Sequence, residues 1–197
     1  MNLALYGGTF DPIHRAHLIV AAEAAEQFKL DAVWFVTAGQ PPHKTAGSTT
    51  PYEHRQRMVE LACAGDPRFH WPRLEEAAGA SYTIHTIERV RATLAPGDRL
   101  LFLIGADAFA EIGTWYRSAE VLAAVEFIVV SRPGYVYPVP AGARIHRLET
   151  LALPVSSSEI RRALEQGETP GELPDAVSQY IRAHGLYRLH SAARSSR

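Results

Sequence analysis

The sequence predicts an α/β fold: a doubly wound parallel sheet of about five strands, with helices at the C-terminal end. Three observations support this. Short apolar segments, typical of strands buried on both faces, alternate with longer segments that suit helices. Glycine or polar residues follow several of the apolar segments, as expected where a chain leaves a sheet. A chain of 197 residues, 47% of them hydrophobic, is long enough to bury one sizeable core.

The expected elements follow one another in the order of a Rossmann-like fold. Strands are expected at residues 3–6, 32–37, 68–71, 99–104 and 125–131, with a further short strand at 144–148. Helices are expected from Pro12 through Phe28 and at residues 52–64, 81–94, 157–166 and 174–184. We expect a single domain over residues 1–190 and a frayed tail at 191–197.

Composition narrows the class of protein. The formal net charge of −1 comes from 20 basic and 21 acidic residues without a long run of either sign, so no nucleic-acid or membrane surface is expected. The single cysteine excludes an intramolecular disulfide. Neither a signal peptide nor an apolar segment of ~20 residues is recognisable, so we expect a cytoplasmic protein. The sequence does not determine the oligomeric state, and a homo-oligomer is one of the possibilities.

Residues 6–17, which read Tyr-Gly-Gly-Thr-Phe-Asp-Pro-Ile-His-Arg-Ala-His, join the first strand to the first helix. We expect the strand to stop at Gly7 and Gly8, which lack a Cβ and tolerate positive φ, so that main-chain N–H groups there can point at an anion. Asp11 is expected as the N-cap and Pro12 as the first helical residue. The partial positive charge of the helix N-terminus would then face the same space.

His14 and His17 are three residues apart and would share one side of this helix, where both could donate to phosphate oxygens. Each part of this segment also has an ordinary explanation. The glycines could form a plain turn, and the histidines could be part of a zinc site or simply packed polar residues. Two histidines leave a tetrahedral zinc site short of ligands. The G-x-G-x-x-G and G-x-x-x-x-G-K-[ST] patterns are absent. The combination predicts a nucleotide site that lacks either common fingerprint.

Residues 155–161, Val-Ser-Ser-Ser-Glu-Ile-Arg, begin a later helix. Ser156 and Glu159 form the S-x-x-E capping box that starts a helix. This box does not account for Ser157, Ser158 or Arg161, whose hydroxyls and guanidinium would bind a polyphosphate together with the free N–H groups of the helix start. Simple capping and phosphate binding both remain open from the residues alone.

Both segments carry a family resemblance. Residues 7–17 resemble the GGTFDPxHxGH signature of the nucleotidyltransferase superfamily, with Ala16 in place of its usual glycine, and residues 155–161 resemble its ISSTxIR element, with Ser158 in place of threonine. The chain from Leu3 to about Arg188 is similar to the bacterial nicotinate-nucleotide adenylyltransferases. These proteins often have an arginine at the position where this chain has Ala77. The segments that carry this second similarity are residues 41–44, 81–83, 105–107, 113–117, 131–134, 173–174 and 184–187.

The resemblance implies an enzyme that transfers AMP from ATP to nicotinate mononucleotide in NAD biosynthesis, with the two nucleotides as its partners. The catalytic residues implied are His14, His17 and Arg161. The ATP-binding residues implied are Gly7, Gly8, Thr9, Phe10, Gly105, Asp107, Ser157 and Ser158. The residues implied for the mononucleotide are Lys44, Thr83, Trp115, Tyr116 and Arg132.

More detailed roles follow from the same resemblance. Trp115 would stack on the pyridine ring, while the main-chain N–H groups of Thr83 and Tyr116 would receive its carboxylate. Lys44 and Arg132 would meet the mononucleotide phosphate. Mg²⁺ would be held mainly by substrate phosphates, with no ligand from protein side chains.

Three other functions stay open. Another adenylyltransferase of the superfamily, such as the pantetheine-phosphate enzyme, would lack the segments at 41–44 and 115–117. A non-catalytic nucleotide-binding regulator would keep the pocket, but the chain retains both histidines and Arg161. An aminoacyl-tRNA synthetase fragment would require a KMSKS-like loop and a basic surface for tRNA, and the chain has neither.

Overall fold

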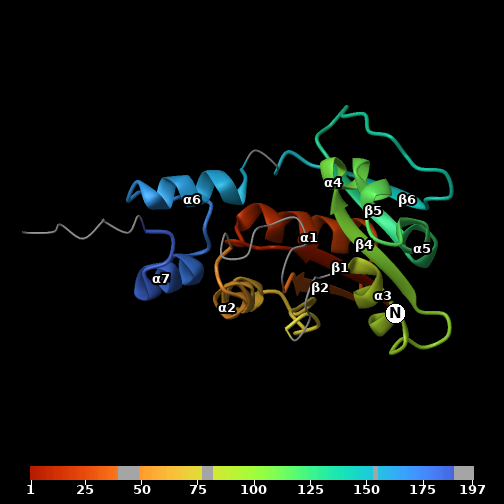
Figure 1. Ribbon diagram of the computed structural model, residues 1–197, viewed down its shortest axis with the longest axis horizontal. Helices are drawn as coiled ribbons and strands as arrows, with labels where there is room; N and C mark the ends of the chain where they lie inside the picture. Colours follow the sequence, from red (N-terminus) through yellow and green to blue (C-terminus); the bar gives the residue numbers. More distant parts are fainter. Residues whose placement is uncertain (40–48, 77–81, 153–154, 189–197) are drawn as a thin grey trace, which may run out of the picture.

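A computed structural model of the protein describes residues 1–39, 49–76, 82–152 and 155–188. Within these residues, six strands form one sheet in the order β3-β2-β1-β4-β5-β6, and every pairing is parallel (Figure 1). The strands are β1 (Asn2–Gly8), β2 (Ala32–Thr37), β3 (Phe69–His70), β4 (Arg99–Gly105), β5 (Glu126–Ser131) and β6 (Ile145–Glu149). The doubly wound fold is confirmed, and the short sixth segment is a full member of the sheet rather than an addition to five strands.

The helices are α1 (Arg15–Gln27), α2 (Tyr52–Cys63), α3 (Thr83–Arg91), α4 (Ala106–Ala110), α5 (Ser118–Ala124), α6 (Ser157–Glu165) and α7 (Asp175–His184), with a 3₁₀ helix η1 (Ile112–Thr114). The sequence did not predict α4, η1 or α5. All three are shorter than two helical turns, too short for a 3.6-residue pattern to stand out. The predicted frayed tail lies outside the described residues.

Alternation along the strands divides the core between the two faces of the sheet. Ala4 and Leu103 point to one face, where they pack with apolar residues of α1, α2, α6 and α7. Leu5 and Phe102 point to the other face, where they pack with residues of α3, α4 and α5. Strands buried on both faces explain why these segments are apolar throughout rather than alternating in polarity.

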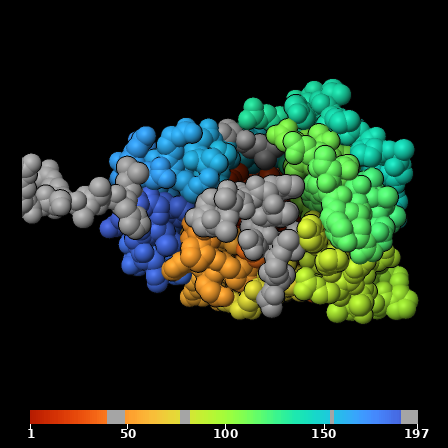
Figure 2. Space-filling model, viewed as in Figure 1, coloured from red at the N-terminus to blue at the C-terminus, as the bar shows by residue number. Residues whose placement is uncertain are grey.

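The C-terminal helices extend the molecule on one side. In Figure 1, α6 and α7 lie at the left end, and α7 contacts α2. Figure 2 shows the same division on the surface, with the blue C-terminal helices and orange α2 on one side and the green segments from β4 to α5 on the other. No helix in the described ranges is both long and apolar enough to cross a membrane.

The strand order reverses between β1 and β4, which are neighbours in the centre of the sheet although α1, β2, α2, β3 and α3 separate them along the chain. Helices that follow neighbouring strands leave in opposite directions at such a point, so a crevice forms beyond the carboxyl ends. β1 ends at Gly8 and β4 ends at Gly105. The crevice therefore opens beside residues 6–17, the first segment singled out in the sequence.

Candidate active site

The turn from β1 into α1 differs from its predicted form. β1 continues through Gly7 and Gly8, which pair with Val36 and Thr37 of β2. Neither glycine has a positive φ. A Cβ on Gly8 would lie only 2.8 Å from the ring of Phe10, so glycine is required here by the close approach of that side chain and not by backbone conformation.

The predicted N-cap at Asp11 is wrong, because α1 begins at Arg15 with His14 as the N-cap. The peptide bond between Asp11 and Pro12 is cis. The Asp11 carboxylate is buried and faces away from the helix, where it accepts hydrogen bonds from the Tyr187 hydroxyl at 2.6 Å and the Thr50 N–H at 3.2 Å. Asp11 therefore joins the turn to the residues just before α2 and to the C-terminal segment.

A small cavity of about 250 Å³ brings the two sequence motifs together. Its walls are the segment from Tyr6 to Asp11, the His17 side chain, and Ser157, Ser158 and Arg161 of α6. The Ser157 hydroxyl donates to the Pro12 carbonyl at 2.9 Å, and Arg161 Nη1 donates to the Asp11 carbonyl at 2.7 Å. We call this cavity the phosphate pocket, because it combines a guanidinium, serine hydroxyls and a helix N-terminus.

The capping box predicted at the start of α6 is present, and it leaves Ser157, Ser158 and Arg161 free to line the pocket. Ser156 Oγ accepts from the Glu159 N–H at 3.2 Å, and the Glu159 carboxylate accepts from the Ser156 N–H at 2.8 Å. The box fixes the helix start with residues outside the pocket. Ser158 and Arg161, which are 3.2 Å apart from Oγ to Nη2, then face the pocket together.

The two histidines have different places. His17 lines the phosphate pocket, whereas His14 is only 4% exposed and is not part of the pocket wall. Their rings lie 3.8 Å apart from centroid to centroid. The His14 main-chain N–H donates to His17 Nδ1 at 3.2 Å. With Nδ1 as the acceptor, the proton of neutral His17 is on Nε2, which leaves Nε2–H as a donor.

Burial keeps both imidazoles neutral near pH 7. It lowers the pKa of His14 to about 4. Burial also lowers the pKa of His17 well below its usual value of 6.5, and the neighbouring His14 lowers it further. His17 can therefore offer a hydrogen bond from Nε2–H without the charge of an imidazolium.

The depressed pKa of His14 should make stability depend on pH. Between about pH 6.5 and pH 4 the unfolded chain binds a proton that the folded chain does not, so the free energy of unfolding rises with pH in this window. We expect His14 alone to lower it by about 2 kcal/mol between pH 7 and pH 5. Urea unfolding at the two pH values measures the difference. In His14→Asn, which keeps an N-cap side chain but cannot titrate, the measured difference should shrink by about this 2 kcal/mol, while the part that His17 contributes should remain. An unchanged difference would contradict this origin.

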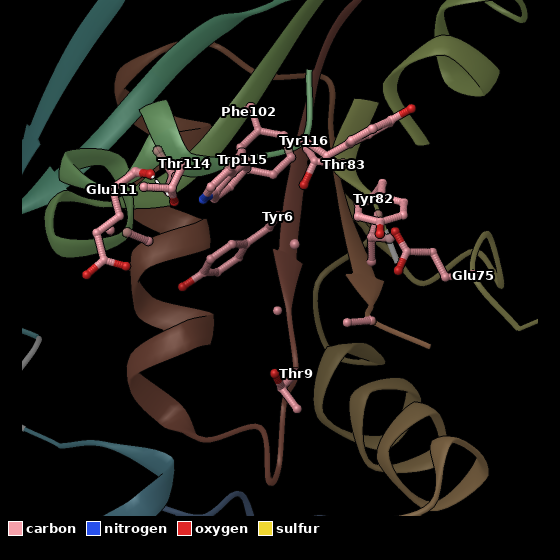
Figure 3. A pocket seen from close by; sticks show the side chains of 17 residues that line it. Tyr6, Thr9, Glu75, Tyr82, Thr83, Phe102, Glu111, Thr114, Trp115 and Tyr116 are labelled. Carbon is pink, nitrogen blue, oxygen red and sulfur yellow. Dashed lines mark hydrogen bonds between the residues drawn. The ribbon is translucent and has the colours of Figure 1, made fainter. Parts of the chain in front are cut away.

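A larger cavity of about 760 Å³ lies beside the phosphate pocket (Figure 3). Trp115, Thr83 and Tyr116 lie together at one end, where the Trp115 ring meets Phe102 edge-on at 6.2 Å and the Tyr116 ring lies 4.6 Å from that of Tyr82. Thr83 is the first residue of α3, so its N–H has no partner within the helix. This end offers aromatic faces and the main-chain N–H of Thr83 to a ligand.

The two cavities share a wall. Both are lined by Tyr6, Gly7, Gly8 and Thr9. In Figure 3 the Tyr6 ring lies between Trp115 and Thr9. A ligand that fills both cavities would pass over the glycines at the end of β1.

The remaining predicted residues divide between the larger cavity and its surroundings. Gly105 lines the larger cavity, but Asp107 and Arg132 are not among its lining residues. Asp107 accepts a hydrogen bond from the Tyr135 hydroxyl at 3.0 Å. Arg132 follows β5, and its carbonyl accepts from the Tyr135 N–H at 3.1 Å. Lys44 lies outside the described residues.

Sequence reasoning did not single out the two acidic side chains of the larger cavity, Glu75 and Glu111. Glu75 is 6% exposed, and it accepts from the Thr86 hydroxyl at 2.7 Å and from the Gly39 N–H at 3.3 Å. Its neighbour Glu76 is an ordinary surface partner of Arg73. Nothing in the local pattern separates two adjacent glutamates, so only the tertiary structure identifies Glu75.

Known proteins resemble this chain along most of its length. The cytidylyltransferase-like family matches residues 5–163. A probable nicotinate-nucleotide adenylyltransferase of Solibacter usitatus is 57% identical over 187 residues, which cover 95% of this chain and all of that protein. A protein of the same name from Thermus thermophilus is 42% identical over 193 residues, again covering 95% of this chain and all of the other.

Solved structures agree on the fold. The nicotinic acid mononucleotide adenylyltransferase of Plasmodium falciparum complexed with NaAD matches with a TM-score of 0.78 at 20% identity, covering 94% of this chain and 97% of that one. The same enzyme complexed with APC matches with a TM-score of 0.77 over 94% and 96% of the two chains. The structural likeness and the near full-length relatives agree, and the chain belongs to the cytidylyltransferase-like family, among its nicotinate-nucleotide adenylyltransferases.

Proposed function

We propose that the protein transfers the adenylyl group of ATP to nicotinate mononucleotide, which yields nicotinate adenine dinucleotide and pyrophosphate for NAD biosynthesis. The observation that carries this proposal is the shared wall of the two cavities. A triphosphate in the phosphate pocket and an aromatic acid in the larger cavity would meet over Gly7 and Gly8. Curated relatives that match nearly the whole chain bear the corresponding name.

The reaction requires no nucleophile from the protein. The second pKa of a phosphate monoester is near ~6, so the attacking oxygen of the mononucleotide is ionised at neutral pH. Catalysis then consists of aligning two anions and stabilising charge on the α-phosphate and the departing pyrophosphate. His17 Nε2–H, Arg161 and the Ser158 hydroxyl would supply donors for this charge.

His14 takes a positioning role in this proposal rather than contact with ATP. It is buried behind His17, and its main-chain N–H holds His17 Nδ1. Phe10 is similar: its ring packs at 5.2 Å from that of His17, so any contact with ATP would come from its main chain. The Ser157 hydroxyl already donates its hydrogen bond to the Pro12 carbonyl, so Ser157 would bind phosphate through its main-chain N–H at the start of α6.

The acceptor would occupy the larger cavity. Trp115 would stack on the pyridine ring, and the N–H groups of Thr83 and Tyr116 would receive the carboxylate, Thr83 at the favourable N-terminus of α3. Lys44 and Arg132 are proposed for the mononucleotide phosphate. Gly105 borders the cavity that would hold the nucleosides. Asp107, which does not line this cavity, is proposed to accept a hydrogen bond from a hydroxyl of the adenosine at its edge.

Mg²⁺ would enter with ATP. The carboxylate of the phosphate pocket, Asp11, already accepts two hydrogen bonds, so phosphate oxygens and water would be its main ligands. In the described parts of the chain, no group of three or more His, Cys, Asp or Glu side chains could hold a metal ion. When bound, the ion would neutralise phosphate charge. A cytoplasmic location is proposed with the function.

Pyrophosphate release tests the proposal. We expect release from ATP and Mg²⁺ with nicotinate mononucleotide, and much less with nicotinamide mononucleotide or phosphopantetheine. Release with phosphopantetheine alone would favour the other adenylyltransferase. Binding of ATP without release for any acceptor would favour a regulator, and both results would overturn the proposal.

A further inference from the structure

Arg55 lies in the first turn of α2 and is buried, although the arginine side chain is always charged in proteins. Only 1% of the surface of Arg55 is exposed to solvent. Burial lowers its pKa, and nearby Asp11 partly offsets this effect. A guanidinium in such a position requires strong hydrogen bonds to offset the loss of water.

Four main-chain carbonyl oxygens supply these hydrogen bonds. Arg55 Nε donates to Thr50 at 2.7 Å, Nη1 donates to Thr9 at 2.8 Å and to Ala38 at 2.7 Å, and Nη2 donates to Gly39 at 2.9 Å. Because the guanidinium is planar and rigid, it holds these four carbonyls in one fixed arrangement. Lysine has a single point of charge and could not reach all four.

The four carbonyls belong to parts of the site that are distant in sequence. Thr9 lines both cavities, and Ala38 lines the larger one. Gly39 and Thr50 are on either side of the segment that carries Lys44. Arg55 thus connects the turn that borders the phosphate pocket to both described flanks of the segment proposed to bind the acceptor phosphate.

Two carboxylates complete this arrangement. Asp11 accepts from the Thr50 N–H, so Thr50 is held through both its main-chain groups. Glu75 accepts from the Gly39 N–H and from Thr86 of α3, the helix that begins with Thr83 in the larger cavity. Continuous hydrogen bonds therefore run from the turn after β1 through Arg55 and Gly39 to α3.

We propose that Arg55 is a positioning residue for adenylyl transfer, which holds Thr9 in the geometry that binds the triphosphate and sets the flanks of the acceptor segment relative to it. The inference rests on the proposed function. Arg55 does not line either cavity and so would not touch substrate. Displacement of Thr9 by even about 1 Å would cost much of the rate, because the reacting groups must be aligned.

Gln56 provides a matched control for loss of a buried polar side chain. It is the next residue of α2, it is also 1% exposed, and its Nε2 donates to the Trp71 carbonyl at 2.8 Å, away from both cavities. Both Arg55→Met and Gln56→Met should lower the melting temperature. Only the first should change the site.

The test measures affinity for a nonhydrolysable ATP analogue by calorimetry, together with kcat and KM for pyrophosphate release, at a temperature where circular dichroism shows every variant folded. We expect Arg55→Met to weaken analogue binding and to lower kcat/KM by about thirtyfold each, while Gln56→Met stays within threefold of the parent. Arg55→Lys should fall between them.

Values for Arg55→Met within threefold of Gln56→Met would overturn the inference, because Arg55 would then serve stability alone. If Arg55→Met does not fold, Arg55→Lys decides: parental affinity and kcat/KM would overturn the inference, and a loss in both would support it. Failure of the proposed function is distinguishable, because the parent would then release no pyrophosphate, whereas analogue binding needs no acceptor.

Discussion

Replacing His17 with alanine is expected to lower kcat for pyrophosphate release by about a hundredfold or more, the scale for loss of one well-placed donor to developing charge. His17 is the histidine that lines the phosphate pocket, and its Nδ1 accepts from the His14 N–H, so Nε2–H is left as the donor that would meet substrate under the proposed function. Steady-state kinetics at saturating ATP and nicotinate mononucleotide measure the loss.

The control is His70→Ala, which removes an exposed imidazole from edge strand β3, outside both cavities. It should leave kcat within threefold of the parent. A His17→Ala enzyme that is folded and also within threefold would mean that this imidazole takes no part in charge stabilisation.

The second large effect is expected for Arg161→Met, which should lower kcat/KM for ATP by about a hundredfold. Arg161 brings a positive charge into the phosphate pocket, and it also fixes the turn after β1 through the Asp11 carbonyl. Because pyrophosphate would bind the same charge, its inhibition of the reaction as a product should weaken as well. Initial rates at varied ATP and pyrophosphate measure both effects.

Arg162→Met tests whether the loss is specific to position 161. Arg162 is the next residue of α6 and is exposed to solvent, so its replacement removes the same charge from the same helix without reaching the pocket. Equal losses in the two variants would show that overall charge, and not the contact geometry of Arg161, supports ATP binding.

The connection from β1 to α1 illustrates how far local reasoning reaches. The sequence correctly predicted a strand followed by a turn and a helix, because these depend on neighbouring residues, but it ended the strand too early, since Gly7 and Gly8 are part of β1. It placed the helix start too early. Asp11 has every local property of an N-cap, but Tyr187 and Thr50 occupy its carboxylate, and both come from elsewhere in the chain. Long-range hydrogen bonds override local capping preference in this case.

The second motif shows the opposite case. The capping box of Ser156 and Glu159 is local, and the prediction is confirmed. That Ser157 and Arg161 bond to the carbonyls of Pro12 and Asp11, 145 and 150 positions away, could be expected only through the family resemblance. The short helices α4 and α5 were missed because their patterns are too brief to rise above the background.

The sequence by itself determined the parallel α/β fold, the family, and the two segments that line the phosphate pocket, because strand hydrophobicity, turn residues and motifs are properties of neighbouring residues. Only the tertiary structure decided that His17 faces the pocket while His14 is buried behind it, and that Arg55 and Glu75 support the site from within. Burial and hydrogen bonds between distant segments set these roles, and neither is visible before the chain is folded.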